Sequence, residues 1–201
     1  MTAQGMRYYS GLIAREYMLC APGILGRKLI NSLCPCDVKL GIRIQDPALQ
    51  TRKCFADAVG GALDVIAHFD PVRLRRVQNE IHTVVHALGV LGSSYERAMK
   101  VSAVNLKCFF YPGDPDMTVK FLASVLVRDA TYGYFFTRGI LRRRRNHNRF
   151  DLLCCKEAER FLRRTGLVHT PWDLDHLSSL KWPEMLRIGL KDVVRGVNGN
   201  Q

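Results

Sequence analysis

The sequence predicts an α+β fold in which a small sheet lies against long helices. Apolar residues recur at helical spacing in residues 54–68, and two further helices are expected over residues 118–137 and 148–164. A β-branched run at residues 81–85 predicts a strand between these helical segments. Because helices lie on both sides of the β region and do not alternate with strands, the pattern is typical of the α+β class.

The first 53 residues are expected to form a basic arm or lead-in. They hold eight Lys or Arg residues against three acids, and their short apolar runs are broken by proline and glycine. An organelle-targeting segment or a surface-associating arm has this composition, but an irregular segment docked on the core is the simplest interpretation. One domain is then expected over residues 54–201.

Two helices should open this domain. The first, over residues 54–68, should bury one apolar face, and a second, short basic helix should follow. Asp70 is a suitable N-cap for the second helix, Pro71 fits its first position, and it should end near Asn79. The apolar face of the first helix consists of Phe55, Val59, Leu63 and Ile66.

The sheet is expected to have two or three strands. Residues 81–85 form the first, and residues 101–111 alternate in part and predict a second. Glycine and serine at residues 89–94 indicate a loop between them, and residues 112–115 (PGDP) indicate a turn.

Two long helices should then pack on this sheet. The first is expected to run from a cap at Thr118 to Thr137, and the second over residues 148–164, where Gly166 stops it. A short last helix is expected to open at Pro171.

Composition favours a protein of a reducing compartment. Seven cysteines form an odd set without a regular spacing, no secretory signal is expected before them, and free thiols are the simplest interpretation. No apolar run approaches the length of a transmembrane helix. A cytoplasmic location is therefore expected, with an organelle matrix as the alternative. The cysteines are Cys20, Cys34, Cys36, Cys54, Cys108, Cys154 and Cys155.

Residues 128–133 (RDATYG), followed by Asp151, are the most informative part of the chain. Arg128 and Tyr132 are four residues apart and therefore share one face of the expected helix. With His at these two positions and Glu in place of Asp129, the segment would be an HExxH helix. In such a helix two imidazoles bind one Zn²⁺, and the glutamate activates a metal-bound water.

The surrounding chain resembles a group of small bacterial proteins of uncharacterised function that carry an HEATH-type HExxH helix. Residues 69–77 (FDPVRLRRV) resemble the entry to one of their helices, and residues 124–133 resemble their zinc helix. Residues 138–140 (RGI) resemble the turn that follows, and residues 150–162 resemble the helix that carries the third metal ligand. The resemblance covers about half of the chain.

This resemblance implies a zincin-like fold, with the small sheet packed against two long helices, and a metal site that has been lost. Arg128 is permanently cationic and cannot bind a metal, and Tyr132 is a poor zinc ligand. Asp129, in the position of the general base, and Asp151, in that of the third ligand, are each one methylene shorter than Glu. The chain is thus expected to be a pseudoenzyme without metal or other cofactor, which binds or scaffolds an unidentified protein partner.

The former metal site is expected to hold an ion pair. Arg128 and Tyr132 belong to a helical stripe whose other members are apolar, and a buried guanidinium needs a partner. In the zincin-like arrangement that partner is Asp151, with the Tyr132 hydroxyl close by. The apolar members of the stripe are Phe121, Val125 and Phe135.

A second signal is positive charge. The net charge is +12, and residues 128–164 hold eleven Lys or Arg residues against four acids. Such a segment can bind a nucleic acid, an anionic surface or an acidic protein, or simply form a solvated loop. The competing functional class is therefore a basic subunit of a ribonucleoprotein or other large assembly. Its contact would be the unbroken block Arg142, Arg143, Arg144 and Arg145.

Two other kinds of site find less support in the sequence. His82 and His86 have the spacing of metal ligands on a helix, but in the expected strand they lie about 13 Å apart. An enzyme that uses Asp129 and Asp151 without zinc would need a nucleophile, and no residue stands out as one. The sequence therefore favours binding over catalysis.

Overall fold

The computed structural model of the chain confirms the α+β class. It describes residues 36–46, 52–87, 92–97, 99–110, 113–140 and 147–167, which form one five-stranded sheet and four α-helices. The first five elements are β1 (Cys36–Lys39), β2 (Ile42–Gln45), α3 (Arg52–Phe69), α4 (Pro71–Glu80) and β3 (Thr83–His86). The others are β4 (Ser93–Glu96), β5 (Val101–Val104), the 3-10 turn η1 (Leu106–Cys108), α5 (Pro115–Thr137) and α6 (His147–Arg164).

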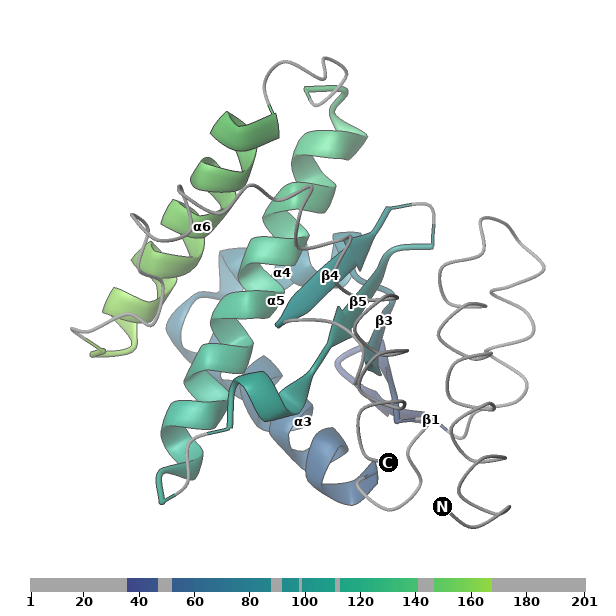
Figure 1. Cartoon of the computed structure of the whole chain (residues 1–201), viewed down its shortest axis with the longest axis vertical. Coiled ribbons are helices and arrows are strands. Elements are labelled where there is room, and N and C mark those ends of the chain that lie inside the picture. Colours follow the sequence, from purple (N-terminus) through teal and green to yellow (C-terminus); the bar gives the residue numbers. More distant parts are fainter. Residues whose placement is uncertain are drawn as a thin grey trace, which may run out of the picture.

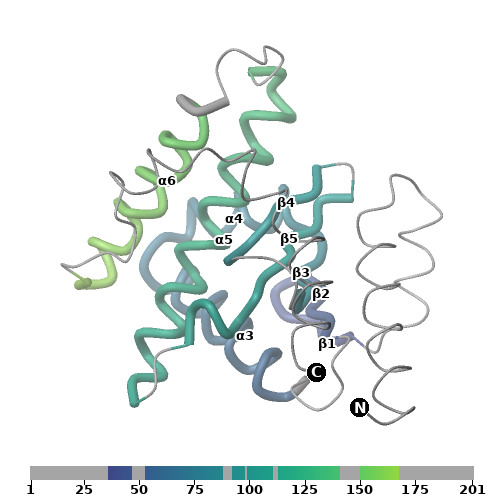
Figure 2. The backbone as a smooth tube through the Cα atoms, viewed as in Figure 1, coloured from purple at the N-terminus to yellow at the C-terminus, as the bar shows by residue number. Residues whose placement is uncertain are grey.

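The sheet has the strand order β1-β2-β3-β5-β4. Its three central strands are parallel, whereas β1 and β4 pair antiparallel at the two edges. Figure 1 shows α5 running between the sheet and α6, and the tube in Figure 2 shows the same arrangement along the backbone. Among the described residues no helix is both long enough and apolar enough to cross a membrane.

The hairpin of β1 and β2 comes from the segment that was expected to be a lead-in. Leu40 and Gly41 form its turn with positive φ angles of 52° and 80°. β2 pairs with β3, so residues 36–45 belong to the same sheet as the rest of the domain. Ile42 and Ile44 are buried in the core, which explains why these strands pair with the sheet.

Strand β4 lies partly in a segment that was expected to be a loop. Gly92 has a φ of 84°, and the next residues pair with β5 from Ser93 against Val104 to Glu96 against Val101. The residues Ser-Ser-Tyr-Glu show no apolar alternation, so their strand conformation comes from pairing with β5 and not from local preference. With β1, β2 and β4, the sheet exceeds the two or three strands that were expected.

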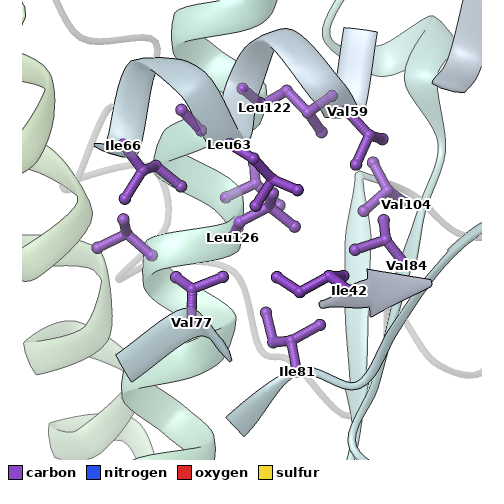
Figure 3. Close-up of a cluster of buried hydrophobic side chains, with 14 of the residues drawn as sticks. Ile42, Val59, Leu63, Ile66, Val77, Ile81, Val84, Val104, Leu122 and Leu126 are labelled. Atoms are coloured by element: carbon purple, nitrogen blue, oxygen red, sulfur yellow. The ribbon is translucent and has the colours of Figure 1, made fainter. Parts of the chain in front are cut away.

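The hydrophobic core lies between the sheet and helices α3 and α5. The expected apolar face of α3 is confirmed, since its four residues are fully buried. Figure 3 shows Leu63 and Ile66 of α3, Leu122 and Leu126 of α5, and Val84 of β3 meeting in this cluster. This burial supplies the main stabilisation of the fold.

The long helix α5 begins three residues before the expected cap at Thr118. Asp114 is the N-cap, its side chain accepts a hydrogen bond from the Met117 backbone nitrogen at 3.0 Å, and Pro115 follows it. This is the same Asp-Pro start that opens α4. Thr118 instead lies buried in the first turn.

Two of the remaining expected elements agree with the structure, and a third is shorter than expected. The strand at 81–85 and the helix at 148–164 correspond to β3 and α6, and Gly166 follows α6 with a φ of 83°. The strand expected over 101–111 stops at Val104, where Asn105 caps η1. The short helix expected from Pro171 lies outside the described residues.

A polar clamp joins the start of α4 to α6. Asp70 caps α4 by accepting a hydrogen bond from the Arg73 backbone nitrogen at 3.0 Å, as expected. Its carboxylate also pairs with the guanidinium groups of Arg73 and of Arg164 on α6. Arg73 donates a second bond to Glu157 of α6 at 2.8 Å. The two helices are therefore linked through the largely buried side chains of Asp70, Arg73 and Glu157 and the more exposed side chain of Arg164.

The Asp70 carboxylate is stabilised in its charged form. Burial raises the pKa of Asp70, but the backbone hydrogen bond from Arg73 and the positive charges of Arg73 and Arg164 lower that pKa below its ordinary value. A carboxylate with a depressed pKa in the folded state adds stability above its unfolded pKa of about 4. That contribution is lost as the pH falls further.

We predict that D70N lowers the free energy of unfolding at pH 7 by about 1.5–3 kcal/mol, because hydrogen bonds to a charged group are lost. The difference between wild type and variant should shrink as the pH falls from about 4 to 2.5. Urea unfolding at a series of pH values measures both effects. D64N, at an exposed ion pair with Lys39, is the control and should cost less than about 1 kcal/mol. A D70N effect that is independent of pH would contradict the clamp.

Candidate functional site

The candidate site lies where α5 faces both the edge of the sheet and α6. Arg128, Asp129 and Tyr132 lie on α5, and Asp151 lies in the first turns of α6. The two helices run side by side, with Phe135 of α5 against Phe150 of α6 at a ring separation of 5.8 Å. Three of the four residues proposed for the former metal site therefore come from one helix and the fourth from its neighbour.

The Arg128 side chain is largely buried, with 12% of its surface exposed, and its sequence neighbour binds the guanidinium. Its Nε and Nη2 atoms donate to Oδ1 of Asp129 at 3.0 and 2.8 Å. Nη2 also donates to the hydroxyl of Ser93, and to the Ser93 carbonyl at 3.4 Å. Because Ser93 opens β4, this side chain ties α5 to the edge strand of the sheet.

Asp129 is almost completely buried, with 2% of its surface exposed. While Oδ1 binds the guanidinium of Arg128, Oδ2 accepts a hydrogen bond from the Ser102 hydroxyl at 2.7 Å. Ser102 lies on β5 and is itself fully buried. The Arg128–Asp129 pair thus joins α5 to two strands, and both oxygens of the carboxylate have partners.

The charges of this pair offset each other. Burial lowers the pKa of Arg128, but the neighbouring carboxylate of Asp129 more than compensates, and the pKa lies above the ordinary value. The guanidinium is therefore charged at every physiological pH. A permanent cation thus occupies the position at which the sequence resemblance implies a first metal ligand.

Tyr132 packs beside a second tyrosine from the edge strand. Its ring meets that of Tyr95 edge to face, with centroids 6.2 Å apart, and the Tyr95 hydroxyl donates to the carbonyl of Glu80 at 2.7 Å. Burial raises the pKa of Tyr132; the charge of Arg97 opposes this shift and that of Asp151 adds to it. The phenol is thus protonated at neutral pH and is not a metal ligand there.

Asp151 lies near the same cluster on the α6 side. It is partly exposed, and its charge raises the pKa of Tyr132 and of the buried thiols Cys154 and Cys155. The described hydrogen bonds of Arg128 to a carboxylate go to Asp129, which was expected to lie on an adjacent face. The pairing of Arg128 with Asp151 stays a prediction.

The two buried cysteines do not supply a nucleophile. Burial raises the pKa of both Cys154 and Cys155, and the positive charge of Arg128 lowers it only in part. A thiol with a raised pKa is protonated at neutral pH and is unreactive. These side chains therefore serve as small apolar groups between α5 and α6.

Residues that the sequence did not indicate complete the polar arrangement. The sequence does not indicate Ser93 and Ser102 as site residues, because their contacts with Arg128 and Asp129 depend on the pairing of β4 with β5. His86 ends β3, pairs through Nδ1 with Asp46 at 3.1 Å and stacks on Phe55. Its Nε2 atom has no hydrogen-bond partner among the residues that the structure describes. Asp46 lies 40 residues before His86, and only the parallel pairing of β2 and β3 brings the two together.

The residues at the four positions expected for a former metal site do not fit zinc. Arg128 donates hydrogen bonds only, and both oxygens of Asp129 are engaged. In the part of the chain that the structure describes, no group of three or more His, Cys, Asp or Glu side chains could hold a metal ion. The basic block Arg142, Arg143, Arg144 and Arg145 lies outside the described residues.

Comparison of the chain with protein-family models, with curated proteins and with solved structures gives no match. The resemblance to HExxH proteins therefore stays a prediction from residues 69–166.

We predict that D129N destabilises the protein by about 3–5 kcal/mol, because it leaves the Arg128 guanidinium buried without its carboxylate. S102A removes one neutral donor to the same carboxylate and should cost about 1–3 kcal/mol. Urea unfolding measures both.

The variant D151N tests the other expected partner. If Asp151 also neutralises Arg128, its removal should cost about 3–5 kcal/mol as well. A cost below about 1 kcal/mol for D151N, with a large cost for D129N, would assign the ion pair to Asp129 alone.

We predict that G133A is destabilising although alanine is the better helix former. A Cβ atom at Gly133 would lie 2.6 Å from the Tyr95 hydroxyl and 2.9 Å from its ring. Relieving such a contact costs about 1–3 kcal/mol. Gly60 in α3 is a matched control, because a Cβ there meets the flexible Lys39 side chain at 3.2 Å. G60A should be neutral or stabilise by up to about 1 kcal/mol in urea unfolding, and equal effects of the two substitutions would contradict the close approach of α5 to β4.

Proposed function

We propose that the protein is a non-catalytic relative of HExxH metallopeptidases, zincin-like in fold, which acts by binding or scaffolding. The observation that carries this proposal is the state of Arg128 and Asp129. These residues occupy the positions of the first metal ligand and the general base, and they bind each other in the interior. Arg128 has no acceptor atom for a metal, and the Asp129 carboxylate already accepts hydrogen bonds from Arg128 and Ser102 in the interior, which disfavours metal binding and proton transfer from water.

The arrangement of the helices supports the zincin-like part of the proposal. The resemblance implies a small sheet, a helix with the HExxH positions, and a second helix that brings the third position to the same place. Here α5 lies between the sheet and α6 (Figure 1). The negative charge of Asp151 on α6 contributes to the raised pKa of Tyr132 on α5. The ion pair of the former site would hold α5 on the sheet, a task that coordination performs in metalloenzymes.

The residues around Arg128 and Asp129 do not support catalysis without zinc. Asp129 is bound by Arg128 and Ser102, and the neighbouring thiols are protonated at neutral pH. A general base needs a free lone pair within reach of a substrate. Among the described residues of the cluster, no carboxylate is arranged beside a reactive nucleophile. The geometry therefore favours a binding protein over a hydrolase.

We predict that the native chain binds no stoichiometric zinc and that the variant R128H/Y132H does. Imidazoles at these positions lie four residues apart on one helix face, with Asp151 as the third candidate ligand. Elemental analysis of the native protein and calorimetric titration of the variant with zinc measure the two outcomes. The variant R128H/Y132F, with one imidazole, is the control and should bind zinc at least about tenfold more weakly.

Two results would contradict the proposal. One is a native protein with one zinc per chain that is lost in D151N. The other is an R128H/Y132H variant that folds, as judged by circular dichroism, but binds zinc no better than its control. The second result would show that the former ligand positions do not converge, and the zincin-like interpretation would then fail.

A further inference from the structure

The outer face of α6 combines cations with exposed leucines. On its inner side α6 buries Cys154, Cys155, Ala158, Phe161 and Leu162 against α5. On the opposite side Leu152 and Leu153 are 37% and 41% exposed, and Lys156, Arg160 and Arg163 follow at helical spacing. Figure 1 shows α6 at the margin of the molecule, beyond α5 from the sheet. We call these five residues, 152, 153, 156, 160 and 163, the outer face of α6.

The acids of α6 offset this charge only in part. Glu159 pairs with Arg163 at 2.5 Å, and Glu157 lies 3.5 Å from Arg160, whereas Lys156 remains exposed. Glu157 turns toward α4, where it binds Arg73 at 2.8 Å and lies 3.6 Å from Arg76. Its side chain is 19% exposed, whereas that of Arg160 is 73% exposed. The largely buried carboxylate of Glu157 thus pairs with several guanidinium groups. The net charge of the exposed side chains on this helix is positive.

Further apolar side chains gather at the end of α6 that carries the leucines. Phe150, in the same turns, packs against Phe135, which brings the last turn of α5 to this end. There Phe136 and Ile140 are 41% and 47% exposed. By sequence, the connection between α5 and α6 also carries four consecutive arginines. Exposed apolar side chains therefore gather at the end of the helix pair that carries Leu152 and Leu153.

An anionic bilayer would bind both the exposed cations and the exposed leucines of this face. Phosphate groups of a nucleic acid would satisfy the cations but would leave the leucines in water. A helix with a basic and an apolar component on its outer side lies in the headgroup region of a membrane, with apolar side chains at the acyl boundary. Each Lys or Arg near an anionic leaflet contributes about 1 kcal/mol.

We propose that the outer face of α6 docks on the surface of an anionic lipid bilayer. The leucines enter the boundary between headgroups and acyl chains, and Lys156 and Arg160 bind the anionic headgroups. This contact is peripheral, and it does not depend on whether the proposed function is correct, because no residue of the former metal site takes part in it.

The test uses the full chain and vesicles of phosphatidylcholine, with or without a quarter of phosphatidylserine, in a sedimentation assay. Binding is expected only to the anionic vesicles and should weaken between 0.1 and 0.5 M salt because the headgroup charge is then screened. K156Q/R160Q should weaken binding about fivefold for each charge removed. L152S/L153S should weaken it roughly fivefold at both salt concentrations, because its effect is apolar.

Matched controls use exposed residues elsewhere. V38S removes an exposed apolar side chain from β1, and K53Q/K107Q removes two exposed charges outside α6, so both should bind like the wild type. Equal sedimentation with neutral vesicles, or none with anionic ones, would overturn the proposal. So would loss of binding only on replacing Arg142–Arg145, or salt-dependent retention on RNA with no binding to vesicles, which would favour a polyanion-binding loop.

Discussion

The position of α5 depends on neutralising one buried guanidinium. Arg128 comes to lie inside the protein, where an unpaired charge would cost several kcal/mol, and Asp129 removes that cost. Satisfying the remaining groups of the pair requires Ser93 of β4 and Ser102 of β5. The ion pair therefore specifies how α5 lies on the sheet, and at Gly133 the helix comes so close to Tyr95 that no side chain fits. Since α3, α4 and α6 all contact α5, their positions follow from it.

Two polar networks orient the helices. One connects α5 to the edge of the sheet through Asp129, and the other connects α4 to α6 through Asp70 and Glu157. Apolar packing between them supplies most of the stability but tolerates small shifts, whereas hydrogen bonds to buried charges do not. Residues 69–77 thus have a structural task, because Asp70 and Arg73 form the clamp to α6.

The proposed loss of catalysis and the proposed membrane contact use opposite sides of the same pair of helices. The inner sides of α5 and α6 meet near the expected metal positions, where Arg128 and Asp129 bind each other. The outer side of α6 keeps its cations and leucines exposed. Together the two proposals describe a protein that binds through an exposed surface and does not catalyse a reaction in its interior.

The sequence by itself determined the α+β class, the apolar face of α3, the Asp-Pro start of α4 and the extent of α6, because periodicity and capping act over a few residues. It also singled out Arg128, Asp129, Tyr132 and Asp151. The tertiary structure alone decided that β1, β2 and β4 join the sheet and that Ser93, Ser102 and Asp46 find their partners. Those pairings join residues far apart in the chain, and their energy comes from burial and strand hydrogen bonds that no local pattern encodes. Even the choice of Asp129 for Arg128 depended on the sheet, whose serines hold both side chains in place.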